Sequence, residues 1–111
     1  MRSYVYLSGA ILTEVIGTTA LKASNGFEQV ALGALAVGLY VLSFYFASQA
    51  LTELPVGLVY ATWSAVGILG LAAIGVVFFD EAIDLAGVVG FCLVIAGVVC
   101  LNVYSSAYSP A

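Results

Sequence analysis

The sequence has 111 residues, of which 64% are hydrophobic and 7% are charged, and its mean hydropathy is +1.20. A soluble domain of this length needs more polar surface to cover its core, so the composition predicts an integral membrane protein. Six acidic residues against two basic ones give a net charge of −4. This balance argues against nucleic acid as a partner, because nucleic-acid binding needs a basic face.

Charged residues and helix breakers divide the chain into four hydrophobic blocks. The blocks cover residues 4–21, 30–51, 56–79 and 85–104. At about 1.5 Å per residue, each block is close to the ~30 Å of a bilayer core. The predicted fold class is therefore an all-α membrane protein with four transmembrane helices per chain. No block remains for a soluble domain, so we expect residues 1–111 to form a single transmembrane unit.

The first block contains one charged residue, Glu14, near its middle. A carboxylate inside a membrane costs about 2.5–3.5 kcal/mol on insertion scales, and its default interpretation is a functional site facing protein or water. Ala10, Gly17 and Thr18 share the helix face of Glu14, at spacings of three and four residues. These small neighbours leave room for a ligand beside the acid.

The second and third blocks carry aromatic residues at helical spacing. Tyr40 and Phe44 share one face, and Tyr60 and Trp63 share another. Aromatic rings together with an anionic carboxylate are suited to binding an organic cation. Interfacial anchoring or simple packing remains the alternative for each ring. Trp63 lies well inside its block, where an interfacial role explains it poorly.

The fourth block carries glycines, and Gly90 and Gly97 would let a second helix approach closely. A single copy would leave Glu14 facing lipid or a shallow cavity, so we expect two copies to associate. Arg2 and Lys22 flank the first block, and this balance lets the chain insert in either orientation. An antiparallel homodimer follows as the expected assembly, although glycine is also simply common in membrane helices.

Few other polar side chains lie within the blocks. Hydroxyl groups in membrane helices usually bond to a carbonyl of their own helix. We expect this of Ser43, Ser48, Thr62 and Ser64. Asn102, near a helix end, is expected to be structural. The sequence has no histidine, and no set of Ser, Cys or acidic residues assembles a catalytic group, so we predict neither an enzyme nor a metal or cofactor site.

Three stretches of the sequence carry a resemblance to a known family. They are YLxGAILxEVIGTT at residues 6–19 with the following Lys22, Ser24, Gly26 and Phe27, then PxGxxYAxWSxVGI at residues 55–68, and Gly90 with AGV at residues 96–98. These stretches resemble helices 1, 3 and 4 of the small multidrug resistance transporters, specifically the EmrE-like quaternary-cation subgroup. The similarity covers nearly the whole chain.

The resemblance implies a multi-pass cell-membrane protein that acts as an antiparallel homodimer. It implies export of hydrophobic and quaternary ammonium cations in exchange for protons, and both would compete for the paired Glu14 carboxylates. The other implied roles are substrate contact for Tyr40, Phe44, Tyr60 and Trp63, a polar neighbour of the acid in Thr18, and dimer contact for Gly90 and Gly97. The implied partners are small organic cations, protons, the lipid bilayer and a second copy of the chain.

The chain departs from the family pattern at two places. Ala65 stands where the family often has the glycine of a helix bend, so the hinge is expected at Ala65 and Gly67. The last loop carries Asp80, Glu81 and Asp84 where many relatives have a base. Three alternatives remain open: a guanidinium exporter, a polyamine exporter, or a non-transporting membrane assembly subunit in which Glu14 pairs with a base on another protein.

Overall fold

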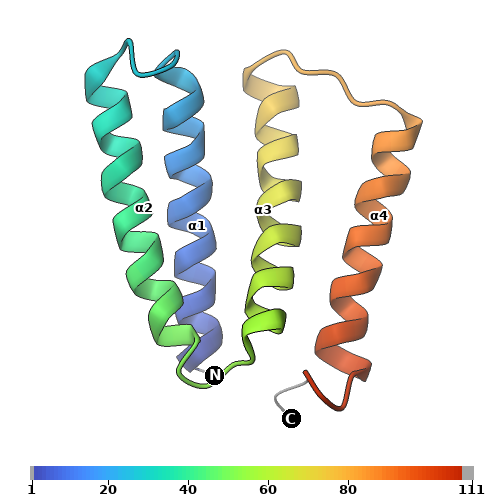
Figure 1. Ribbon diagram of the computed structural model, residues 1–111. Helices are drawn as coiled ribbons and strands as arrows, with labels where there is room; N and C mark the ends of the chain where they lie inside the picture. Colours follow the sequence, from blue (N-terminus) through green and yellow to red (C-terminus); the bar gives the residue numbers. More distant parts are fainter. Residues whose placement is uncertain (1, 109–111) are drawn as a thin grey trace. The chain divides into compact units, whose positions relative to one another are not determined.

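The computed structural model describes residues 2–108, and these are almost entirely helical (Figure 1). The elements are α1 (Arg2–Ala23), α2 (Val30–Ala50), α3 (Val56–Phe78), α4 (Leu85–Val99) and the π-helical turn η1 (Cys100–Tyr104). Four helical segments are long and apolar enough to cross a membrane, the last of them formed by α4 with η1. The predicted class of an all-α protein with four transmembrane helices is confirmed.

The chain divides into two compact units, and the boundary falls between Glu53 and Leu54. The first unit holds α1 and α2, and the second holds α3, α4 and η1. Pro55 lies next to this boundary as the N-cap of α3, with the extended backbone of φ −61° and ψ 142°. Proline has no backbone N–H and cannot continue a helix, so α2 must end before it. The organisation of residues 1–111 as a single membrane unit stays a prediction.

Small residues bring α1 and α2 into extensive contact. Ala10 and Ala36 have no exposed surface. A Cβ atom added at Gly17 would lie 3.2 Å from the Cβ atom of Leu39, so only glycine fits there without a shift. The Ser43 hydroxyl donates a 2.7 Å hydrogen bond to the Ala10 carbonyl across the two helices. The prediction that Ser43 bonds within its own helix is therefore wrong, because its buried hydroxyl faces the backbone of α1.

The turn between α1 and α2 is built from left-handed residues. Asn25, Gly26 and Phe27 have φ values of 52°, 66° and 69°. The Ser24 hydroxyl accepts a 3.1 Å hydrogen bond from the Phe27 backbone N–H, which holds this conformation. The Phe27 ring folds onto Gly33 in the first turn of α2, where any side chain would collide with it. This short turn keeps the two helices antiparallel and adjacent.

In the second unit α3 and α4 touch much less, and no residue of α4 is buried. Asp84 caps α4, since its side chain accepts a 2.9 Å hydrogen bond from the Gly87 N–H. Near the other end of the pair, the Asn102 amide donates to the Thr62 hydroxyl at 3.1 Å. This bond agrees with a structural role for Asn102. It also gives the Thr62 hydroxyl a partner on another helix, which the sequence did not predict.

Candidate cation site on the first helix pair

Glu14 lies near the middle of α1 and is half-buried. The hydroxyl of Thr18, one turn further along, donates a 2.6 Å hydrogen bond to Oε2 of the carboxylate. The same Thr18 oxygen lies 2.6 Å from the hydroxyl of Tyr40 on α2. The three side chains therefore form one continuous hydrogen-bonded chain from the acid to the tyrosine.

The direction of this chain depends on the charge of the acid. A threonine hydroxyl has one hydrogen to donate, and an ionised carboxylate can only accept. While Glu14 is ionised, Thr18 donates to it and must accept from Tyr40. When Glu14 carries a proton, it can donate to Thr18, and Thr18 can then donate to the tyrosine oxygen. The Tyr40 hydroxyl is thus linked to the protonation of Glu14 through Thr18.

Close packing of α1 and α2 makes this link possible. A Cβ atom at Gly17 would lie 3.3 Å from Cε1 of Tyr40, so the absent side chain leaves the space that the tyrosine ring occupies. Ala10, fully buried, also lies in the α1–α2 contact, through the bond from Ser43 to its carbonyl. The structure thus places Ala10 and Gly17 where they set the spacing of the helices that hold Glu14.

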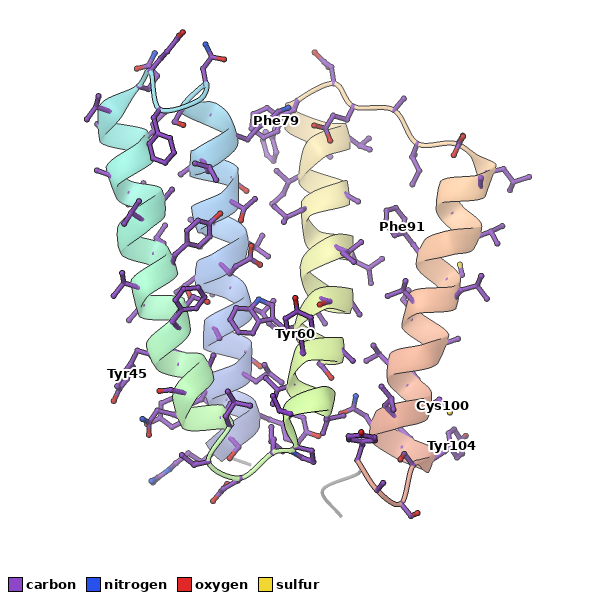
Figure 2. The ribbon with its side chains drawn as sticks, viewed as in Figure 1. Tyr45, Tyr60, Phe79, Phe91, Cys100 and Tyr104 are labelled. Atoms are coloured by element: carbon purple, nitrogen blue, oxygen red, sulfur yellow. The ribbon has the colours of Figure 1, made fainter. Side chains whose placement is uncertain are left out.

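The other predicted aromatic residues differ among themselves in how far they are exposed. Phe44 follows one turn later on α2, but its side chain is 65% exposed. Tyr60 on α3 is 73% exposed (Figure 2), and Trp63 on the same helix is half-buried. The shared face predicted for Tyr40 and Phe44 therefore holds one ring inside the helix pair and one ring on its surface.

The two hinge candidates lie in the second unit. Ala65 is 2% exposed and Gly67 is buried, and α3 passes through both without interruption. Their bending role stays a prediction.

A groove that the sequence did not predict leads to Thr18. It has a volume of about 500 Å³ and lies at the end of α1 and the following turn. Its lining residues are Thr18, Leu21, Lys22, Asn25, Gly26 and Phe27. The three left-handed residues of the turn shape its wall, and their Asn-Gly pair was the available signal in the sequence. The groove gives Thr18, which donates to the Glu14 carboxylate, an open side.

Four membrane-length helices with an acid in the middle of one define a multi-pass membrane protein with an intramembrane polar site. The family model described as "Small Multidrug Resistance protein" matches residues 2–94. The chain belongs to this family of transporters. It is thus a transport protein rather than an enzyme, and a multi-pass protein of the plasma membrane.

Similar proteins cover almost the whole chain. The multidrug transporter EmrE of Escherichia coli strain K12 is 41% identical over 105 residues, 95% of this chain and 96% of the relative. The quaternary ammonium compound-resistance protein QacF of Klebsiella aerogenes is 40% identical over the same shares of 95% and 96%. The multidrug resistance protein EbrA of Bacillus atrophaeus is 46% identical over 99 residues, 89% of this chain and 94% of the relative.

Proposed function

We propose that this chain is a proton-coupled exporter of hydrophobic and quaternary ammonium cations. The observation that carries the proposal is the half-buried Glu14 carboxylate, held by Thr18 and linked through it to Tyr40. The substrate class rests on the relatives, of which one is named a multidrug transporter and another a quaternary ammonium compound-resistance protein.

A carboxylate among apolar helices attracts a cation strongly, because charges interact more strongly where water is scarce. Quaternary cations have no N–H group to donate, so their binding depends on this attraction and on aromatic faces. We assign such a face to Tyr40, whose hydroxyl is bonded to the Thr18 that holds Glu14. Phe44, Tyr60 and Trp63 are exposed or half-exposed rings that we assign to the apolar body of the same ligand.

Protons and the cation compete in this proposal for the oxygens of Glu14. A proton neutralises the carboxylate and removes the attraction for a cation, whereas a bound cation stabilises the ionised form. If the empty, ionised protein rarely reorients and the two loaded forms do so readily, a proton gradient drives cations outward. The direction of the hydrogen bond between Thr18 and Tyr40 would then reverse on exchange, so that a residue of α2 responds to the ligand bound at Glu14.

We further propose that the working form is an antiparallel homodimer, in which the two Glu14 side chains share one chamber. Arg2 and Lys22 lie at opposite ends of α1, which favours neither orientation. Gly90 and Gly97 on α4 have no atom within 4 Å of an added Cβ, so this surface is open to a second helix. Inverted pairs of this kind are a common basis of transport.

Replacing Glu14 by Gln tests the proposal. The purified protein in vesicles should lose saturable tetraphenylphosphonium binding and proton-driven uptake together, because glutamine can neither ionise nor take up a proton. The matched control is Glu28→Gln in the α1–α2 turn, where the side chain is exposed and accepts from Asn25. This control should keep both activities.

Persistent pH-coupled transport by Glu14→Gln would refute the exporter mechanism. The wild-type protein is also tested against guanidinium and a polyamine. Preference for either over tetraphenylphosphonium would replace the proposed substrate class. The absence of saturable binding of any of these cations by the purified chain would favour a non-transporting assembly subunit.

A further inference from the structure

The Asn102 side chain joins the end of the fourth membrane segment to α3. Its amide nitrogen donates to the Thr62 hydroxyl at 3.1 Å and to the Val98 carbonyl at 2.9 Å. A carbonyl can only accept, so the amide must present its nitrogen to Val98. The second N–H of the same nitrogen is then directed to Thr62. One side chain thus donates a hydrogen bond to its own helix and a second one to α3.

A π-helical turn places Asn102 in this position. The segment η1 runs over Cys100–Tyr104, and the Ser105 N–H bonds to the Cys100 carbonyl at 3.0 Å, five residues back. The wider turn changes the direction in which side chains leave the helix, and such turns often occur at functional sites. The residues of α4 before it are all at least partly exposed. The π-helical turn therefore directs a polar contact to α3 at the end of an otherwise thinly packed helix.

The partner of Asn102 lies next to two of the proposed ligand-binding rings. Thr62 directly precedes Trp63 and follows Tyr60 by two positions. Successive side chains on an α-helix are rotated by roughly 100°, so Trp63 and Tyr60 project about 100° and 200° away from Thr62. Fixing Thr62 against η1 therefore fixes the direction of both rings. The Tyr60 side chain, nearly opposite, is 73% exposed, as this rotation requires.

A second contact holds the same part of α3. The Tyr108 ring lies over Gly57, where an added Cβ atom would be 3.0 Å from Cε1 of the ring. The Tyr108 N–H also bonds to the Ser105 hydroxyl at 3.2 Å, which closes the turn after η1. Residues 102 and 108 thus contact α3 at Thr62 and at Gly57, and Tyr60 lies between these two positions in the sequence.

We propose that Asn102 and Thr62 are positioning residues that set the rotation of the α3 segment carrying Tyr60 and Trp63. The inference rests on the proposed function, because the direction of these rings matters for transport only if they contact the cation. It adds that selectivity for ring-bearing cations depends on a hydrogen bond that does not involve the carboxylate. Attraction by Glu14 should survive its loss, since the hydrogen bond from Thr18 to that acid lies within α1 and does not involve Asn102 or Thr62.

The test uses variants that remove the bond with little change of shape. These are Thr62→Val, Asn102→Leu and their combination, with Thr62→Ser as the variant that retains the hydroxyl. Thr19→Val is the matched control, because the half-buried Thr19 hydroxyl bonds only to the Val15 carbonyl of its own helix. Binding of tetraphenylphosphonium and of the ring-free tetraethylammonium is measured on the purified full-length protein. Trp63, the single tryptophan of the sequence, supplies an intrinsic fluorescence signal without any ligand.

Thr62→Val and Asn102→Leu should each weaken tetraphenylphosphonium binding about fivefold, the size of one hydrogen bond between membrane helices. Tetraethylammonium binding should change less than about twofold on the same scale. The combined variant should be no worse than either single one. Thr62→Ser and Thr19→Val should match the wild type. Trp63 emission should shift in Thr62→Val and not in Thr19→Val.

Unchanged tetraphenylphosphonium binding in Thr62→Val would overturn the inference. Additive losses in the combined variant would do so too, and equal losses for the two cations would indicate a general structural effect instead of positioning. Failure of the proposed function is recognised separately, as a wild type whose cation binding does not depend on Glu14. Even then, identical Trp63 spectra in Thr62→Val and the wild type would refute the positioning role of the bond between Asn102 and Thr62.

Discussion

The two helix pairs of the chain are held together in different ways. The α1–α2 pair packs through residues without large side chains, such as Ala10, Gly17 and Ala36, and a buried hydrogen bond from Ser43 crosses it. The α3–α4 pair has no buried residue on α4, and a hydrogen bond from the Asn102 amide to the Thr62 hydroxyl joins the fourth membrane segment to α3. One pair is closely packed, and the helices of the other pair are in much less contact.

This difference matches the roles that we propose for the pairs. A carboxylate that must bind two ligands in turn needs a fixed hydrogen-bond partner, and the closely packed pair supplies Thr18, whose hydroxyl is itself bonded to Tyr40. Elements that bend or exchange partners during transport come from regions with few buried contacts. The open surface of α4 belongs to such a region, whereas the proposed hinge residues Ala65 and Gly67 of α3 are buried.

The largest expected effect is from Gly17→Leu, which targets the close packing of the first pair. The added side chain would press on Leu39 and on the Ala36 carbonyl, 3.2 and 3.4 Å from a Cβ atom at that position. Overpacking of this kind costs about 1–3 kcal/mol, and a rigid helix contact gives the upper part of the range. Unfolding of the purified protein by sodium dodecyl sulfate, followed by circular dichroism, measures the loss.

Gly97→Leu is the control, because an added Cβ atom on α4 has no neighbour within 4 Å. It should leave the unfolding of the single chain nearly unchanged and weaken only dimer formation. Equal destabilisation of the single chain by both substitutions would remove the contrast between the helix pairs.

The next expected effect concerns the ligand, and it follows from Trp63→Ala in the second pair. Loss of a cation–π contact that is shielded from water costs about 2 kcal/mol, or roughly 30-fold in affinity. Tetraphenylphosphonium should lose this much, while the ring-free tetraethylammonium should lose less, because Glu14 still attracts its charge. Isothermal titration of both cations decides whether Trp63 contacts the cation or serves in packing. Equal losses would assign Trp63 to packing.

The sequence predicted the helices well because the signals for them are local. Pro55, the charged loops and the lengths of the apolar blocks separate four membrane segments in any tertiary context. The isolated acid in the first block was equally conspicuous, since a membrane carboxylate has no ordinary packing role. The spacing of four residues from Glu14 to Thr18 is also a local property of the helix, and the structure places the two side chains 2.6 Å apart.

The sequence could not predict which face of each helix meets another helix. Apolar residues surround every helix, so no polar stripe marks the solvent side as it does in soluble proteins. Tyr40 and Phe44 have the same periodicity, yet one is bonded to Thr18 and the other is 65% exposed. For the same reason the hydroxyls of Ser43 and Thr62 were assigned to their own helices, although each has a partner on another helix.

The smallest expected effect comes from Ser43→Ala, which tests the hydrogen bond between α1 and α2. This change removes the bond to the Ala10 carbonyl and leaves a cavity no larger than one hydroxyl group. Hydrogen bonds between membrane helices contribute about 0.6 kcal/mol on average and up to about 1.7 kcal/mol. Ser43 has no exposed surface and its hydroxyl bonds across the helix pair, so the loss should fall in the upper half of this range.

Ser48→Ala separates the contact between helices from the mere presence of a hydroxyl. The exposed Ser48 hydroxyl bonds to the Tyr45 carbonyl of its own helix, so its removal should change the unfolding midpoint in sodium dodecyl sulfate very little. If Ser43→Ala and Ser48→Ala have the same unfolding midpoint, the bond between helices from Ser43 adds no more stability than a bond within one helix. Helix spacing set by Ala10, Gly17 and Ala36 would then suffice to hold Tyr40 against Thr18, and the hydrogen bonds of Glu14 would depend on packing alone.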